Sequence, residues 1–347
     1  SLDSVTTPLF SFRRINFPSN PTDKVFTMTS SHEPPLQHVS VIGLGTMGHA
    51  IAQTLAVAGH SVTAYDSSPA ACGNALDRIT ANLKQMVDAQ LLQEEIMADV
   101  LNRITICDTE RDAVKNTEVV TEAIAEDLEL KQELFVRIEN QVNRNTIIAS
   151  NTSSFPVTQI AKHMQYPERA IVTHWFNPPH IVPVVEVVPG EQTADQTSEA
   201  IYQLLEHAGK TPVLLNQEIP GFLVNRVQTA MFREIWDLLD RGVANAEQID
   251  KAIQGSMGLR LAAMGPVSIV DFAGWDVTSR VYSNLIPDQK NDYSLPQRIK
   301  KMVEEKHFGV KSGHGVFEYP EEDRDRYLSE RDRKYLQLVK LLYDMNA

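Results

Sequence analysis

A histidine and a downstream glutamate are the residues of this sequence best suited to proton transfer. His174 begins the segment His-Trp-Phe-Asn-Pro-Pro, and Glu186 lies in the apolar stretch that follows. An imidazole titrates near neutrality, so it can accept a hydroxyl proton, and a carboxylate behind the ring fixes its tautomer. The two residues are therefore a candidate general base and its orienting acid. The alternative interpretation is a packed histidine beside an unrelated surface acid.

A glycine-rich turn upstream of this pair has the pattern of a dinucleotide site. The turn follows a predicted strand at 38–42 and opens a predicted helix, and its residues are Gly43, Leu44, Gly45, Thr46, Met47 and Gly48. The first glycine permits the tight turn, the second lets the backbone approach a pyrophosphate, and the third lets the helix pack against the strand. The amides at the start of that helix would face the phosphates.

The acidic residue that follows the next predicted strand indicates which dinucleotide is bound. Asp66 ends the segment 61–65, where a dinucleotide fold places the carboxylate that binds the adenosine ribose. That carboxylate would accept hydrogen bonds from both ribose hydroxyls and repel a 2′-phosphate, so the sequence favours NAD over NADP. Together with His174, the turn indicates a redox enzyme in which a histidine moves a proton while a nicotinamide takes a hydride.

The elements that must position these residues alternate between strand and helix patterns. Strands are expected at 38–42, 61–65, 104–107, 119–121, 146–149, 170–173, 184–188 and 213–215, and helices within 69–103, at 127–141 and at 193–208. This alternation predicts an α/β, Rossmann-type, doubly wound and mostly parallel sheet. His174 would end one strand, and Glu186 would lie on a following strand that runs back beside it.

The chain beyond Pro220-Gly221 has a different pattern, which predicts a C-terminal all-helical domain. Helices are expected at 222–239 and 246–254 and onward to Tyr343, with few strand signals apart from 315–317. The expected organisation is an extension at 1–36, an NAD-binding domain at 37–218 and a helical domain at 219–347. A helical unit this apolar buries a face against its own helices or against a second subunit.

Composition excludes several classes of partner. The formal net charge is -13, so no basic surplus exists to neutralise nucleic acid or an anionic membrane, although a small anionic ligand needs only a local pocket. No apolar run reaches the ~20 residues that cross a bilayer. Two cysteines are too few for a disulfide framework, which favours a reducing compartment, and the histidines show no metal-ligand spacing with carboxylates.

The N-terminal extension has the composition of a targeting segment. Residues 1–35 are rich in Ser, Thr and Pro, contain the basic and aromatic cluster 11–17, and have few acids. These features are typical of a mitochondrial transit peptide, so a matrix location is expected. The alternative is an unstructured tail on a cytoplasmic protein, in which case Met28 is a second candidate start.

Four motifs together resemble the L-3-hydroxyacyl-CoA dehydrogenase family. They are the segment 150–154 (Ser-Asn-Thr-Ser-Ser), the segment 174–179 with Glu186, the segment 220–226 (Pro-Gly-Phe-Leu-Val-Asn-Arg) and the late motif 309–317. They occur in the order of that family, and the similarity extends from about Gln37 to Tyr319. The resemblance implies an NAD-dependent oxidoreductase of fatty-acid metabolism that acts on a small-molecule substrate and forms a homodimer.

The resemblance also assigns residue roles. It makes His174 the base and Glu186 its orienter, with Ser153 hydrogen-bonded to the reacting oxygen and Asn225 closing over the site. Asn177 matches a substrate-side position, and the positions that approach the cofactor are Glu126, Lys131 and Asn151. The alternative roles are helix caps for Ser153 and Asn225, and a solvated salt pair for Glu126 with Lys131.

Two departures from the family pattern leave the substrate open. The positions that contribute a serine and a lysine to coenzyme A in the fatty-acid enzymes fall near Asn82 and Ala89 here, with only Lys84 basic nearby. The segment 177–186 is closer to the branch that oxidises free hydroxy acids, such as gulonate or carnitine dehydrogenases and lambda-crystallins. The expected substrate is an L-3-hydroxyacyl thioester or a close 3-hydroxy acid. The alternatives are a free acid paired with Arg226 or Arg260, and a non-catalytic nucleotide-binding protein.

Overall fold

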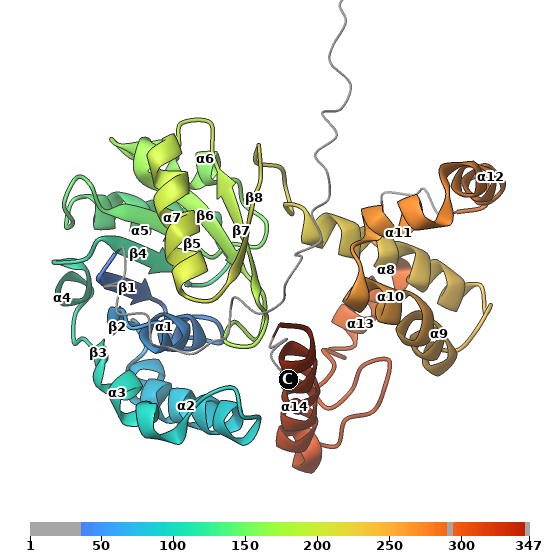
Figure 1. Ribbon diagram of the computed structural model, residues 1–347, viewed down its shortest axis with the longest axis horizontal. Helices are drawn as coiled ribbons and strands as arrows, with labels where there is room; N and C mark the ends of the chain where they lie inside the picture. The colour runs from blue at the N-terminus through green and yellow to red at the C-terminus, as the bar shows by residue number, and fades with distance from the viewer. Residues whose placement is uncertain (1–35, 290–293, 344–347) are drawn as a thin grey trace, which may run out of the picture.

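The computed structural model describes residues 36–289 and 294–343. The N-terminal extension, and with it the transit-peptide prediction, lies outside the described residues. The described chain forms a sheet flanked by helices, with a group of helices beside it (Figure 1). Within this part of the chain, no helix combines the length and apolar character needed to span a bilayer.

The sheet has the doubly wound order that the alternating pattern predicts. Its strands follow the order β3-β2-β1-β4-β5-β6-β7-β8, so the chain reverses its direction of growth between β1 and β4. All neighbours are parallel except β6 and β7. The bounds are β1 (His38–Ile42), β2 (Ser61–Tyr65), β3 (Ile104–Ile106), β4 (Val119–Glu122), β5 (Ile147–Ser150), β6 (Ala170–Trp175), β7 (Val184–Pro189) and β8 (Thr211–Leu214). Ligands bind such sheets at the carboxyl ends of the strands, beside the reversal point.

Helices cover both faces of the sheet and enclose two apolar clusters. One cluster joins the sheet to α1 (Gly48–Val57), α2 (Pro69–Asp88), α3 (Met97–Asn102) and α7 (Asp195–His207). The other joins the opposite face to α4 (Glu110–Val114), α5 (Leu128–Glu139) and α6 (Val157–Ile160). Local signals start these helices: Ser68 caps α2 by accepting from Ala71 N, with Pro69 in the first turn, and Asp127 caps α5 through Leu130 N.

The antiparallel pair β6–β7 brings the candidate base and acid together. Residues directly opposite each other on antiparallel strands point their side chains to the same face, with Cβ atoms about 5 Å apart. The register places His174 opposite Glu186. The predicted strand that runs back beside His174 is therefore confirmed, and the pairing follows from backbone hydrogen bonding.

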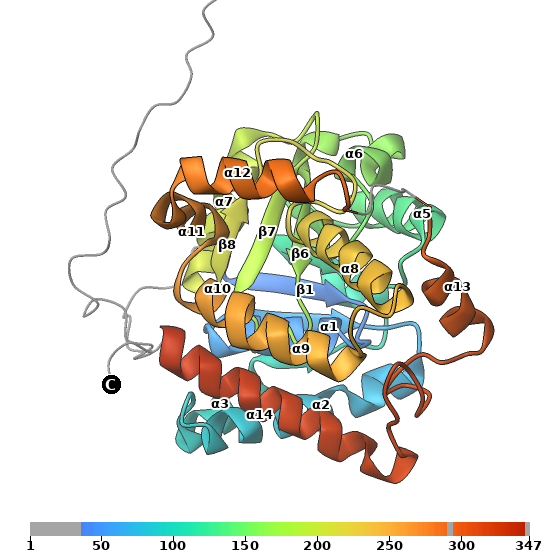
Figure 2. The same cartoon turned by 90° about the vertical axis from the view of Figure 1, so that its right-hand side faces the viewer.

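The helices after β8 form a separate layer, as predicted. They are α8 (Val224–Asp240), α9 (Ala246–Ile253), α10 (Leu259–Ala263), α11 (Pro266–Ala273), α12 (Trp275–Leu285), α13 (Gln297–Glu304) and α14 (Arg324–Tyr343). Viewed from that side, α8, α9 and α12 lie in front of the sheet, and α14 crosses in front of α2 (Figure 2). Lys340 Nζ of α14 donates to Gln90 Oε1, just beyond α2, at 2.6 Å.

One feature differs from the sequence-based predictions, and a second adds detail to them. The apolar triplet 315–317 is not a strand, because only isolated bridges link His314 to Gly309 and to Glu318 in a turn that contains two glycines with positive φ. The segment 69–103 is helical, as predicted, and is divided: α2 ends at Asp88, Gln90 has a φ of 61°, and short helices resume at Glu94. Neither the turn at 309–318 nor the division of the segment 69–103 involves a residue of the candidate site.

Candidate active site

The glycine turn between β1 and α1 has the geometry that close approach of a phosphate requires. Gly43 has a φ of +97°, and a Cβ on it would lie 2.6 Å from Ala123 O. A Cβ on Gly48 would lie 1.7 Å from Gly43 O, so any other residue there would separate the helix from the turn. A Cβ on Gly45 would meet no atom within 4 Å, which leaves space beside the backbone for a ligand. These features fit the pyrophosphate of a dinucleotide.

Asp66 holds the turn and stands where a ribose would bind. It follows β2, and its Oδ2 accepts a hydrogen bond from Leu44 N at 2.6 Å while its Oδ1 accepts one from Ser68 N at 2.8 Å. The carboxylate is partly exposed at the edge of the glycine turn. It therefore both fixes the turn and remains accessible to the ribose hydroxyls of NAD.

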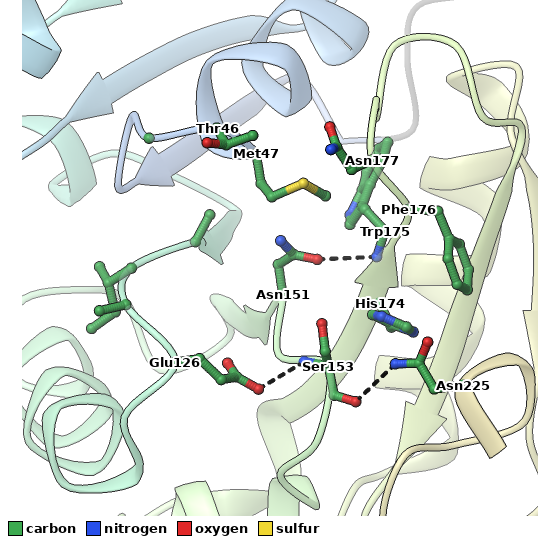
Figure 3. A pocket seen from close by; sticks show the side chains of 14 residues that line it. Thr46, Met47, Glu126, Asn151, Ser153, His174, Trp175, Phe176, Asn177 and Asn225 are labelled. Atoms are coloured by element: carbon green, nitrogen blue, oxygen red, sulfur yellow. Dashed lines mark hydrogen bonds between the residues drawn. The ribbon is translucent and has the colours of Figure 1, made fainter. Parts of the chain in front are cut away.

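A cavity of about 500 Å³ opens between the turn and the end of β6. Figure 3 shows residues from several strands converging on it. Its lining contains the predicted residues Gly45, Thr46, Met47, Glu126, Asn151, Ser153, His174, Asn177 and Asn225. It also contains Ala123, Ile124, Ala125, Trp175 and Phe176, which sequence reasoning did not single out as site residues. The first three follow β4, the strand beside the reversal point, and that position is the signal that would have identified them.

His174 and Glu186 form a buried hydrogen-bonded pair at the wall of this cavity. The distance from His174 Nδ1 to Glu186 Oε2 is 2.6 Å, and the side chains are 3% and 0% exposed. Since Nδ1 is bonded to the carboxylate, Nε2 is the ring nitrogen left to exchange a proton with a ligand. The alternative of an unrelated surface acid is wrong, because Glu186 is fully buried against the imidazole.

The second oxygen of Glu186 connects the pair to the helical layer. Glu186 Oε1 accepts from Leu223 N at 3.0 Å and from Val224 N at 2.9 Å, at the start of α8. The next residue, Asn225, donates from Nδ2 to Ser153 O at 3.3 Å (Figure 3). Asn225 therefore bridges two layers of the molecule at the cavity.

The loop that carries Ser153 is held by Glu126. Glu126 Oε1 accepts hydrogen bonds from Thr152 Oγ1, Ser153 N, Ser154 N and Ser154 Oγ, at 2.7 to 3.1 Å. Burial by itself raises the pKa of this carboxyl, but the bonds from Thr152 and Ser154 and the nearby Lys131 ammonium hold the pKa below its ordinary value. Glu126 is therefore ionised at neutral pH and fixes Ser153 at the cavity.

Lys131 lies behind this loop and does not line the cavity. Its side chain is fully buried, with Nζ 2.6 Å from Glu122 Oε1 and 3.4 Å from Glu126 Oε2. The prediction of a solvated salt pair is therefore wrong for the lysine. Its predicted cofactor role can be exerted only through Glu126, which does line the cavity.

The remaining predicted residues have these positions. Asn151 lines the cavity, and its Oδ1 accepts from Trp175 N at 3.0 Å, which ties the end of β5 to the end of β6 (Figure 3). Asn177 is exposed at the cavity rim. Arg226 donates to Pro220 O and Arg260 to Ser256 O, and neither contributes to the cavity lining. Among the described residues, no three His, Cys, Asp or Glu side chains are grouped so as to hold a metal ion.

Comparison with known proteins identifies relatives of both parts of the chain. The model of the 3-hydroxyacyl-CoA dehydrogenase NAD binding domain matches residues 38–219, and that of the 3-hydroxyacyl-CoA dehydrogenase C-terminal domain matches residues 221–319. The 5-formyl-3-hydroxy-2-methylpyridine 4-carboxylate 5-dehydrogenase of Mesorhizobium japonicum is 35% identical over 307 residues, which are 88% of this chain and 98% of that one. The mitochondrial hydroxyacyl-coenzyme A dehydrogenase of Homo sapiens is 33% identical over 291 residues, covering 82% and 91%.

A solved structure gives a similar result. The crystal structure of 5-formyl-3-hydroxy-2-methylpyridine 4-carboxylic acid 5-dehydrogenase, described as an NAD+-dependent dismutase, aligns with a TM-score of 0.83 and 34% identity. The alignment covers 89% of this chain and 99% of that one. Both the sequence and the fold are therefore shared along nearly the whole length of these relatives.

Proposed function

Because the chain belongs to the 3-hydroxyacyl-CoA dehydrogenase family and is an NAD-dependent oxidoreductase of CH–OH donors, we propose that His174 is its general base and that its substrate is a small free carboxylic acid bearing a hydroxyl group. The observation that carries the assignment of the base is the 2.6 Å bond between His174 Nδ1 and Glu186 Oε2 at the wall of the cavity. When bound, NAD supplies the acceptor for the hydride.

The side chains of the site divide the proton chemistry among them. His174 Nε2 takes the hydroxyl proton of the substrate, and Glu186 stabilises the imidazolium that forms. Ser153, at the cavity rim, hydrogen-bonds the reacting oxygen. Asn225 holds the Ser153 loop through Ser153 O and closes the site from the helical layer.

The cofactor would be bound by the glycine turn and the loops opposite it. Gly45, Thr46 and Met47 would contact the pyrophosphate, and Asp66 the adenosine ribose. Glu126 and Asn151 would line the nicotinamide half of the site, with Asn177 on the substrate side. Lys131 would act from behind, by keeping Glu126 ionised and in place.

The surface of α2 supports a free acid over a thioester. Asn82 points inward and donates to Gln53 Oε1 at 3.0 Å, and Ala89, at the end of α2, has no polar side chain. Gln90, next to it, is already bonded to Lys340 of α14. A coenzyme A nucleotide carries several negative charges, and the side chains at positions 82, 89 and 90 supply no cation; the ammonium beside them, Lys340 Nζ, comes from α14. The substrate named for the Mesorhizobium relative is likewise a free carboxylate.

An L-3-hydroxyacyl-CoA substrate is the second candidate. It is favoured by the human relative, which is named a hydroxyacyl-coenzyme A dehydrogenase and matches 82% of this chain. Under this candidate the same residues act on the same C–OH group. The difference lies only in what the rest of the substrate contacts.

The deciding experiment measures NADH formation by the purified protein with L-3-hydroxybutyryl-CoA, free L-3-hydroxybutyrate, gulonate, carnitine and 5-formyl-3-hydroxy-2-methylpyridine 4-carboxylate. We expect turnover of at least one free acid and none of the thioester. Turnover of the thioester alone would replace the first candidate by the second. Tight NADH binding without turnover on any of them would support a non-catalytic nucleotide-binding protein.

Two further properties belong to this proposal. A homodimer formed through the helical layer is supported by its exposed apolar side chains, among them Val267, Phe272 and Trp275, which are 73%, 72% and 64% exposed. A mitochondrial location is supported by the composition of residues 1–35. A fluorescent fusion of residues 1–36 that stays in the cytosol would show that this segment is not a transit peptide.

A further inference from the structure

Phe222 has a backbone conformation that its residue type disfavours. Its φ is 51°, in the left-handed region, where a bulky residue is an outlier. Gln90 and Lys306 are the other non-glycine residues with positive φ in the described chain. Both are exposed and directly follow the C-cap of a helix, where this conformation is common. Phe222 instead precedes a helix and is fully buried, so its conformation needs another cause.

The Phe222 side chain packs on the catalytic histidine. Its ring centroid lies 5.5 Å from that of His174, with the planes tilted by 54°. Phe176 also contacts the imidazole, at 4.5 Å and 56°. Phe176 lines the cavity, whereas Phe222 is not among the lining residues and is buried in the apolar cluster. One aromatic ring is thus on the cavity side of His174, and the other is in the core.

The residues that follow Phe222 contact other parts of the same site. Leu223 N and Val224 N donate to Glu186 Oε1, whose partner oxygen holds His174. Before them, Phe222 N donates to Ile219 O at 3.0 Å. The backbone of Phe222 is therefore fixed on both sides. A change to an ordinary negative φ would move either its ring off His174 or the following amides off Glu186.

From these contacts we infer that Phe222 is a positioning residue for His174, and that its left-handed backbone is retained for this purpose. The inference rests on the proposed role of His174 as general base. One hydrogen bond at Nδ1 fixes a single point of the imidazole and leaves the ring able to pivot about it. Packing by Phe222 restricts that pivot and keeps Nε2 aimed into the cavity. Unfavourable backbone conformations persist where the surroundings determine them, and they cluster at functional sites.

The test compares two buried phenylalanines. Phe222→Leu and Phe222→Met keep an apolar side chain that is unbranched at Cβ but remove the flat ring face. Phe135→Leu is the matched control, since Phe135 is also fully buried and belongs to the same apolar cluster. With whichever probe substrate is turned over, kcat of the Phe222 variants should fall about 10- to 100-fold, because a misplacement near 1 Å has an effect of this size. The KM for NAD should stay within about 2-fold, and the control should keep its kcat.

A double variant separates the positioning of His174 from a general loss of structure. In His174→Ala, the further change Phe222→Leu should leave the residual kcat unchanged, because the ring that Phe222 positions is absent. A purely structural role would lower kcat in both backgrounds, and by as much in Phe135→Leu as in Phe222→Leu. Either result would overturn the inference.

A spectroscopic readout needs no substrate. The proton between His174 Nδ1 and Glu186 should give a downfield NMR signal that is absent in His174→Ala. It should shift or broaden in Phe222→Leu and stay unchanged in Phe135→Leu. An unchanged signal in Phe222→Leu would also overturn the inference. Full turnover by His174→Ala, by contrast, would overturn the proposed base and leave the packing result standing.

Discussion

The sheet and the helices that cover it bury their apolar side chains, whereas the helical layer exposes many of its own. Two clusters of buried side chains fill both faces of the sheet, and the chemistry-bearing pair His174–Glu186 lies among them. In α8 and α10 to α13 no residue is buried within the described chain, and Phe272 and Trp275 are largely exposed. The sheet thus supplies its own core. The helical layer contributes Asn225 to the site, and its apolar side chains are exposed within the described part of the chain.

The largest expected effect is on the stability of the sheet, which contains a buried ion pair between Lys131 and Glu122. Lys131→Met leaves Glu122, which is 0% exposed, without its cation. The free energy of unfolding should fall by about 3–5 kcal/mol, the usual result of breaking a buried pair from one side. Urea denaturation followed by circular dichroism measures this change. Arg241→Met, in the exposed pair with Asp237 of the helical layer, is the control and should leave the midpoint unchanged. Equal effects of both variants would contradict the comparison.

The next effect concerns catalysis within the sheet. His174→Ala should lower kcat about 100-fold or more, because the hydroxyl proton loses its acceptor. The dissociation constant for NADH, measured by fluorescence, should stay close to that of the unmodified protein. His163→Ala, an exposed histidine elsewhere in the sheet domain, serves as the control. A variant at His174 with an undiminished rate would disprove its role as base.

A third prediction concerns the helical layer alone. Phe272→Glu should raise the dissociation constant of the proposed homodimer about 30-fold or more, the change expected for a buried aromatic anchor. Light scattering after size-exclusion chromatography over a range of concentrations measures it. Leu130→Glu places the same charge at an exposed apolar position on the sheet side and should leave the mass unchanged. A monomeric unmodified protein would remove the dimer from the proposal.

The smallest expected effect is a pH dependence. Because the pKa of Glu126 is lowered by folding, its carboxylate stabilises the folded protein above its unfolded pKa near 4.5, and this contribution is lost as the pH falls through the folded value. The unmodified protein should therefore exceed Glu126→Gln in stability at pH 7, by less than about 1 kcal/mol given its partial exposure. The difference should vanish in acid. A difference that grew on acidification would show that the pKa shift has the opposite sign.

The sequence predicted the sheet because strands and helices depend on local patterns, whereas spacing left the pair His174–Glu186 as one of two alternatives and the family resemblance decided for it. Strand patterns at 170–173 and 184–188 are short, apolar and close in the chain, so their pairing needed no knowledge of the rest of the fold. The Glu126 hydrogen bonds to the Ser153 loop join residues far apart in sequence, and they exist only because β4 and β5 are neighbours. The left-handed backbone of Phe222 has no signature in its residue type. It arises from the backbone hydrogen bonds before and after Phe222 and from the packing of its ring on His174.

The same reasoning explains the error at 315–317. A glycine followed by two apolar residues suits a strand only if a partner strand lies beside the segment, and the sequence does not show whether it does. Here the segment turns back on itself, with His314 pairing to Gly309 and Glu318. Residues 123–125 were missed as site residues for a related reason. Ala123, Ile124 and Ala125 carry no reactive group, so they contribute to the cavity by position rather than by side-chain chemistry.

The register of β6 and β7 has an evolutionary consequence. Backbone hydrogen bonds hold His174 opposite Glu186, so the connection 176–183 between the strands does not set their distance. That connection carries Phe176 and Asn177, which face the ligand cavity. Insertions, deletions and substitutions beyond Phe176, which packs on His174, can therefore alter substrate choice while the proton-transfer pair stays intact. Relatives with different substrates can descend from one ancestor by changing this hairpin tip, and directed evolution of new specificity should begin there.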